Sequence, residues 1–198
     1  KKDGSGTAFS DGEEIYNLSL TENDNVVLYA QWRKRKSVLE IDPGKGEYDG
    51  KKENLRITGD YLSEYRADST LLTPPEGFRV EFDTNGGERI EAIYSNQKFT
   101  GWNCSQPFNG ELKDNIYTFT GADGTVDRIT AIYEPQSIQL PPAEKEGYSF
   151  GGWFLDKEQQ EPVGTTGDTW IPQKDTTLYA SWVELQLMSK DNYSAYQG

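Results

Sequence analysis

Apolar and polar residues alternate in several short stretches, which is the pattern of β-strands with one buried face. The stretches that show it are 28–32, 55–60, 80–82, 117–119 and 126–133. Between the last two, Gly121-Ala122-Asp123-Gly124 supplies residues that favour a tight turn. We therefore expect five strands there, and we expect 117–133 to form a β-hairpin.

Turn and helix signals complete this picture. Asn85-Gly86-Gly87 follows the strand expected at 80–82 and predicts a tight turn with positive φ angles. The paired prolines at 74–75 and 141–142 favour extended backbone. Helical periodicity is weak throughout, and residues 61–68 are the best candidate for one or two helical turns. The chain is therefore predicted to be mainly β, with at most short helical turns.

Internal repetition is the strongest signal in the chain. Leu28-Tyr29-Ala30-Gln31-Trp32 recurs as Leu178-Tyr179-Ala180-Ser181-Trp182, with a diverged copy at 129–133. Phe99-Thr100-Gly101-Trp102 matches Phe150-Gly151-Gly152-Trp153. The Gly-Trp motif precedes the closing aromatic residue by a similar distance in both copies. These spacings predict tandem modules of about 50 residues each.

The spacing also predicts how the modules divide the chain. Counting back from Trp32 places its Gly-Trp partner at or before Lys1, so 1–36 is expected to hold the end of a truncated module and a basic linker. Residues 37–135 are expected to form one expanded module or two interlocked ones. Residues 136–183 are expected to form a complete module, and 184–198 to begin a further truncated one.

The best-preserved copy resembles a known family. Its motifs are Gly147-Tyr148-Ser149-Phe150-Gly151-Gly152-Trp153 and Asp175-Thr176-Thr177-Leu178-Tyr179-Ala180-Ser181-Trp182. Together they are similar to the Listeria–Bacteroides repeat, also called the internalin-type B repeat. The resemblance implies small β-grasp-like modules, strung in an elongated array in secreted or cell-wall-attached proteins, chiefly of Gram-positive bacteria. Such proteins look like stalks and adhesive spacers, and no shared catalytic residue accompanies the motif.

Composition narrows the possible functions. The net charge is −13, which argues against nucleic-acid binding because that requires clustered cations. The short basic run at 33–36 is interpreted as a solvated linker. There is no histidine to activate the single cysteine, Cys104, which is interpreted as a bystander thiol. No apolar run approaches the roughly 18 residues of a membrane span, so no membrane insertion is expected in this stretch.

Candidate sites are few. The recurring aromatic residues are interpreted as core positions of the repeat: Trp32, Trp102, Tyr133, Trp153 and Trp182. Trp170 does not recur, so it is the candidate for an exposed ligand contact, with local packing as the competing interpretation. Oxygen ligands at 83–88 lack the spacing of a calcium loop. No catalytic residue, cofactor site or metal site is predicted.

We therefore expect a non-catalytic stretch of a larger bacterial surface protein, extracellular and monomeric. It would serve as a stalk, spacer or adhesion module that contacts neighbouring repeat modules of its own chain. One alternative is a module that binds carbohydrate or a host-surface protein through exposed aromatic residues. A second is an accessory part of a polysaccharide-degrading enzyme.

Overall fold

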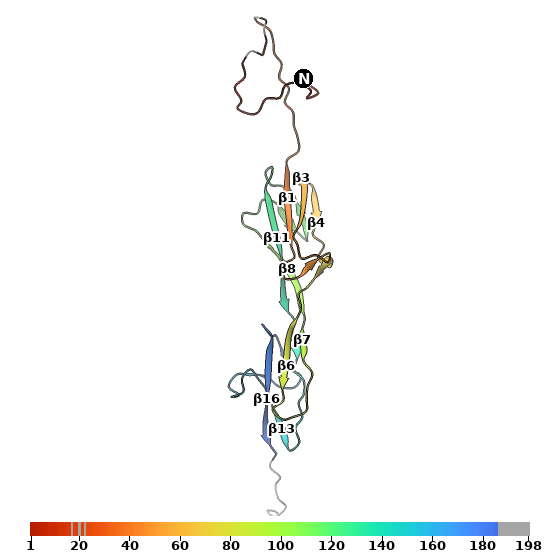
Figure 1. The fold of residues 1–198 in the computed structure, drawn as a ribbon, viewed down its shortest axis with the longest axis vertical. Helices are drawn as coiled ribbons and strands as arrows, with labels where there is room; N and C mark the ends of the chain where they lie inside the picture. Colours follow the sequence, from red (N-terminus) through yellow and green to blue (C-terminus); the bar gives the residue numbers. More distant parts are fainter. Residues whose placement is uncertain (17, 20, 22, 186–198) are drawn as a thin grey trace, which may run out of the picture.

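The computed structural model describes residues 1–198 except 17, 20, 22 and 186–198. The described part is mainly β, which confirms the predicted class. Its one helical element is a 3-10 turn, η1 (Ser69–Leu71), whose Asp68 side chain accepts a hydrogen bond from the Thr70 N–H. Figure 1 shows the strands gathered around two larger sheets, with the run from β7 (Ile93–Ser95) to β8 (Gln97–Cys104) passing from one to the other.

The first sheet has the strand order β3-β1-β11-β8. Its strands are β1 (Lys36–Asp42), β3 (Leu55–Asp60), β8 (Gln97–Cys104) and β11 (Val126–Pro135). β1 and β11 run parallel, and the other two pairs are antiparallel. Leu39, Ile41 and Ile129 point to the same face and are fully buried. This face of the first sheet forms one hydrophobic core.

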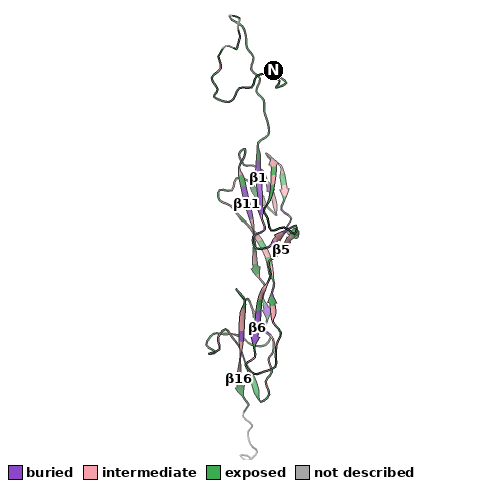
Figure 2. Cartoon of the chain, in the orientation of Figure 1, coloured by how far each residue is buried: buried purple, intermediate pink, exposed green. Residues whose placement is uncertain are grey.

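The second sheet has the order β14-β13-β16-β6-β7. Its strands are β6 (Phe78–Asp83), β7 (Ile93–Ser95), β13 (Tyr148–Phe154), β14 (Pro162–Gly164) and β16 (Thr176–Glu184). β6 and β16 run parallel, as β1 and β11 do. Val80 and Leu178 are fully buried in a second core. Figure 2 shows burial concentrated on β1, β11 and β6.

Smaller strands cover the inner faces of both sheets. In the first half these are β4 (Glu64–Arg66), β9 (Glu111–Lys113) and β10 (Ile116–Thr118), which form a three-stranded sheet, and the pair β2 (Glu47–Tyr48) and β5 (Leu72–Thr73). In the second half the pair is β12 (Ile138–Gln139) and β15 (Thr169–Trp170). Each core therefore lies between a large sheet and a thin second layer.

The two large sheets repeat one plan. In each, the strand with the closing aromatic residue lies between a parallel neighbour and an antiparallel neighbour that carries Gly-Trp. Register pairs Ile41 with Ile129 in the first sheet and Phe82 with Leu178 in the second. Both Gly-Trp strands shift register at the glycine motif, which leaves Thr100 unpaired in one and Gly151 in the other.

The chain alternates between the two sheets. It places β1 and β3 in the first, β6 and β7 in the second, β8 and β11 in the first, and β13, β14 and β16 in the second. Strand pairing thus crosses the boundary expected between residues 135 and 136, because β16 takes its parallel partner from residues 78–83. The sheets follow an interleaved division rather than consecutive ranges.

Three local expectations are wrong. Residues 117–133 do not form a hairpin, because β10 pairs with β4 and β9 whereas β11 pairs with β1 and β8. Residues 61–68 are not helical, since β4 occupies their centre and pairs with β10. Residues 28–32 form no strand, because the backbone of no described segment pairs with theirs.

Two strands and one turn expected from the sequence are confirmed, and one expected module lies mostly outside the described residues. β3 and β6 confirm the strands expected at 55–60 and 80–82. Asn85 and Gly86 have φ angles of 48° and 84°, and the Gly87 N–H donates to the Thr84 carbonyl at 3.0 Å, which confirms the tight turn. The module expected to begin at 184 lies, from residue 186 onward, outside the described residues.

Candidate functional site

The two Gly-Trp motifs place their indoles in equivalent positions. Trp153 is fully buried, and its Nε1 donates to the Pro141 carbonyl at 2.9 Å. Trp102 is half-buried, and its Nε1 donates to Asn115 Oδ1 at 3.0 Å. A phenylalanine meets each indole edge to face, Phe150 at 5.2 Å and Phe99 at 5.1 Å. Both indoles thus have their polar atom satisfied inside the protein.

The closing aromatic residues also correspond. Trp182 packs against Phe150 at 5.5 Å, and Tyr133 against Phe99 at 6.2 Å. The Trp182 Nε1 donates to the Thr84 carbonyl at 2.9 Å. The Tyr133 hydroxyl is buried without a hydrogen-bond partner, and burial raises the pKa of Tyr133. Three of the five recurring aromatic residues therefore pack against a core, and Tyr133 packs against Phe99.

The remaining two tryptophans named from the sequence lie in different settings. Trp32 is 92% exposed, in a segment without strands. Trp170 lies in β15, pairs with Ile138, and packs half-buried against the second core. Its ring is therefore partly committed to packing and only partly available to a ligand.

The basic run at 33–36 contacts the first sheet rather than extending freely into solvent. Arg33 forms hydrogen bonds with both Asp123 oxygens, at 3.0 and 2.5 Å. This side-chain hydrogen bond, with the backbone N–H of Lys36, lowers the pKa of Asp123 to about 2. The Arg35 guanidinium lies over the Tyr61 ring at 4.0 Å. The run joins residues 1–32 to the loops at one end of the first sheet.

A buried carboxylate lies beside the first core. Asp127 is 1% exposed and accepts hydrogen bonds from the Tyr117 hydroxyl at 2.6 Å, the Gly110 N–H at 2.6 Å, and both nitrogens of Asn109. Burial alone would raise the pKa of Asp127, but these hydrogen bonds outweigh it and lower the pKa. Burial and the same hydrogen bond raise the pKa of Tyr117. The carboxylate thus anchors a loop and is closed to solvent.

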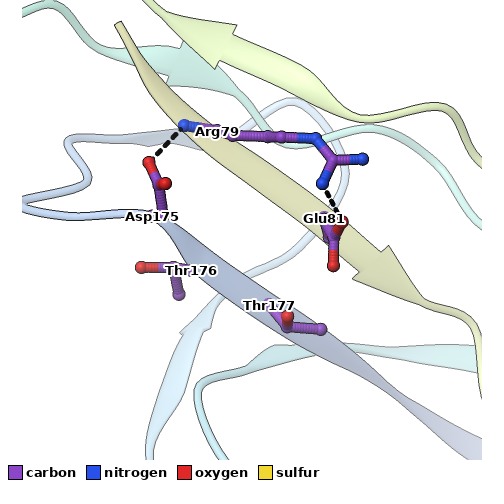
Figure 3. Close-up of a pocket in the computed structure, with 5 residues that line it drawn as sticks. All are labelled: Arg79, Glu81, Asp175, Thr176 and Thr177. Carbon is purple, nitrogen blue, oxygen red and sulfur yellow. Dashed lines mark hydrogen bonds and ion pairs between the residues drawn. The ribbon is translucent and has the colours of Figure 1, made fainter.

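An open hollow on the outer face of the second sheet is the best candidate for a contact site. Arg79 and Glu81 point outward from β6 because Val80 and Phe82 between and after them point into the core. Figure 3 shows the Arg79 backbone N–H donating to Asp175 Oδ1, at 2.9 Å, and the guanidinium paired with Glu81. Thr176 and Thr177 complete the lining.

The equivalent place on the first sheet is filled by side chains. Glu40 corresponds to Glu81, but it is only 8% exposed. Arg128 donates to Glu40 Oε2 from Nε and Nη2, at 3.1 and 3.0 Å, and Arg56 approaches at 3.5 Å from the opposite neighbour. The hydrogen bond from Arg128 outweighs burial and lowers the pKa of Glu40. The arginines are similarly exposed on both sheets, but of the two equivalent carboxylates only Glu81 is accessible.

The chemistry of the hollow is that of a polar contact surface. Its guanidinium, carboxylates and hydroxyls can exchange hydrogen bonds with a partner, and Tyr94, paired with Arg79 across the ladder, adds a half-exposed ring. Within the described residues, no group of three or more His, Cys, Asp or Glu is placed to hold a metal ion.

The hollow was not predicted from the sequence, although part of the signal was present. Alternation around Val80 marks Arg79 and Glu81 as outward-facing. Asp175 lies 96 residues away, and only the parallel pairing of β6 with β16 brings it to Arg79. Cys104 is half-buried at the first core, where burial raises the pKa of its thiol.

Two curated proteins of Evansella cellulosilytica are similar to this chain. One, described as a putative Gly-rich membrane protein, is 24% identical over 91% of the chain. The other, described as a putative membrane protein, is 25% identical over 82% of the chain. The chain spans only 21% and 23% of the lengths of these relatives. Both relatives are thus much longer proteins whose names place them at a membrane.

Two further comparisons complete the picture. No solved structure matches the chain. In the described residues, no helix has the length and apolar character needed to cross a bilayer. The matched family model spans residues 116–181, so it runs from β10 in the first half to β16 in the second. This stretch matches the Listeria-Bacteroides repeat domain, as the motifs around Trp153 and Trp182 indicated.

Proposed function

We propose that this chain is a non-catalytic spacer in a larger protein of the bacterial cell surface, secreted or attached to the cell wall. The observation that carries the proposal is the fate of the recurring aromatic residues. Trp102, Trp153 and Trp182 pack against the two cores, and Tyr133 packs against Phe99, instead of lining a shared binding cleft. The repeated residues therefore maintain the packing of each module, as expected of a module that serves as a spacer.

The matched family and the relatives support this location. The repeat domain is not a catalytic family, and both relatives carry names that refer to a membrane. An array of interleaved β-grasp-like modules, elongated along the direction in which the sheets succeed one another, would hold whatever lies beyond it away from the cell. We propose no membrane insertion, nucleic-acid partner or cofactor for this stretch, and we propose that it is monomeric.

The shape follows from the proposal and is measurable. A compact chain of the length of residues 36–185 has a radius of gyration of about 15 Å. We expect small-angle X-ray scattering of that segment to give a clearly larger value and a long tail in the distance distribution. A radius near about 15 Å would remove the basis for a spacer.

The open hollow on the second sheet favours one alternative, a module that contacts a polar partner such as a glycan or host-surface protein. Its test is a panel of immobilised glycans and cell surfaces, probed with the full chain and with Arg79→Ala and Tyr94→Ala variants. Saturable binding that both variants lose, with unchanged thermal unfolding, would favour this alternative. Arg56→Ala, at the filled position of the first sheet, is the matched control and should bind as the unmodified chain does.

A further inference from the structure

In the first sheet, the parallel pair β1–β11 links the N-terminal segment to the second sheet. β1 begins at Lys36, where residues 1–35 join the fold. Its partner β11 ends at Pro135, and two residues separate it from β12 of the second half. Because the strands are parallel, the start of β1 and the end of β11 lie at opposite ends of the ladder. Tension between these points slides one strand along the other.

The second sheet has the same arrangement in mirror order. β6 enters at Phe78 directly from the first half, and its parallel partner β16 ends at Glu184. Tension between Phe78 and Glu184 therefore slides β6 against β16. In both sheets, one parallel strand leads outward along the chain and the other leads to the neighbouring sheet.

The junction passes tension through several segments at once. The chain crosses between the sheets at 74–77, at Asn96 and at 136–137. The crossings are bonded to one another, since Gln136 N–H donates to the Asn96 carbonyl at 2.8 Å and Ser95 Oγ to the Gln136 carbonyl at 2.5 Å. Gln97 Nε2 donates to the Glu76 carbonyl at 3.0 Å. No single strand at the junction carries the whole load.

We propose that the two parallel ladders, β1–β11 and β6–β16, are the elements that bear mechanical tension when the chain is pulled through its ends. Ladder hydrogen bonds run across the strands, so a sliding force must break all of them together. A force that pulls two strands apart from one end breaks them one at a time. Only the biological use of this strength rests on the spacer role proposed above.

Side chains reinforce the first ladder along its register. Glu40 faces Arg128 and Asp42 faces Thr130. Arg128 holds Glu40 at 3.0 and 3.1 Å, and Thr130 Oγ1 donates to Asp42 at 3.3 Å. Charge-assisted bonds of this kind are stronger than neutral ones. They join the two strands that tension would slide apart.

The test is single-molecule force spectroscopy on the full chain in two pulling geometries, in a Cys104→Ala background. Handles on Lys36→Cys and Glu184→Cys load both ladders in shear. Handles on Lys36→Cys and Asp60→Cys, which pair at one end of the antiparallel β1–β3 ladder, unzip it. Forced unfolding is governed by the barrier along the pulled direction. We expect a several-fold higher unfolding force through 36 and 184.

Equal forces in the two geometries would overturn the proposal and leave the spacer role untouched. A compact scattering envelope together with unequal forces would contradict the spacer role but support the load-bearing ladders. A matched pair of variants adds a residue-level readout in the 36/184 geometry. Arg128→Met, on the loaded partner of β1, should lower the force of the first-sheet event, whereas Arg56→Met, which contacts the same Glu40 from β3, should lower it less at equal loss of thermal stability.

Discussion

At the residue scale, two glycines show how closely the modules copy one another. A Cβ on Gly87 would lie 2.6 Å from the Glu144 carbonyl and 2.8 Å from the Trp182 ring. A Cβ on Gly46, at the equivalent place, would lie 2.6 Å from the Tyr133 hydroxyl. Each closing aromatic ring thus packs directly onto backbone that has no side chain. The glycine after each turn is required for lack of space.

Gly87→Ala should therefore lower the free energy of unfolding by about 1–3 kcal/mol, because the added methyl meets backbone and a packed ring. Gly151→Ala is the control, since its methyl would meet the Ser181 hydroxyl, a rotatable side-chain end, at 3.1 Å. Gly151→Ala should lower the free energy of unfolding clearly less than Gly87→Ala does. Urea denaturation followed by tryptophan fluorescence measures both, and equal losses would contradict this account of Gly87.

Asp127→Asn should lower the free energy of unfolding by about 3 kcal/mol, because every group around the carboxylate is a donor and the new amide N–H₂ would face one of them. Asp60→Asn, at a half-exposed ion pair, should cost at most about 1 kcal/mol. A loss for Asp127→Asn no greater than for Asp60→Asn would show that the network is dispensable.

The pH dependence of stability follows from the same carboxylate. Its pKa is lowered in the folded state, so its contribution is fully present above about pH 4, the unfolded value, and is lost as pH falls through the folded pKa. We expect the stability difference between the unmodified chain and Asp127→Asn to shrink on acidification below about pH 4. Denaturation curves at a series of pH values measure it, and a constant difference would refute it.

At the element scale, β16 shows why a motif is not a folding unit. Residues 136–183 contain both motifs of the best copy, yet the parallel neighbour of β16 is β6, which lies before them in the chain. Val80 and Phe82 of β6 belong to the second core. Without β6, one flank of β16 loses its hydrogen bonds and the core loses these apolar side chains.

Residues 136–184 produced alone should therefore be largely unfolded, whereas residues 74–184 should keep Trp153 buried. Far-UV circular dichroism and the tryptophan emission maximum distinguish the two outcomes. Val80→Asp in the longer segment should abolish its fold, because it places a charge at a fully buried site. A cooperative unfolding transition for 136–184 alone would show that β6 is not essential.

At the scale of the whole molecule, interleaving changes what is released when one sheet opens under tension. If the first sheet yields first, residues 97–135 remain bracketed by β7 and β12, which stay in the second half. Tension then extends only residues 36–77. In consecutive modules, the whole of 36–135 would extend.

The length gained in the first-sheet event therefore distinguishes the two organisations. Force–extension traces should show the gain of residues 36–77, at up to about 3.5 Å per residue. Cross-linking residues within 97–135 should leave this gain unchanged. A gain that matches 36–135 would show that the chain is organised as consecutive units.

The sequence by itself determined the local features, because alternation, turn residues and repeats act over a few neighbours. It predicted β3 and β6, the Asn85-Gly86 turn and the family of residues 116–181. Only the tertiary structure decided which strands pair. A strand presents the same backbone donors and acceptors to any neighbour, so its partner depends on which faces bury together. That choice separated β10 from β11, brought Asp175 to Arg79, and joined β16 to β6 across the chain.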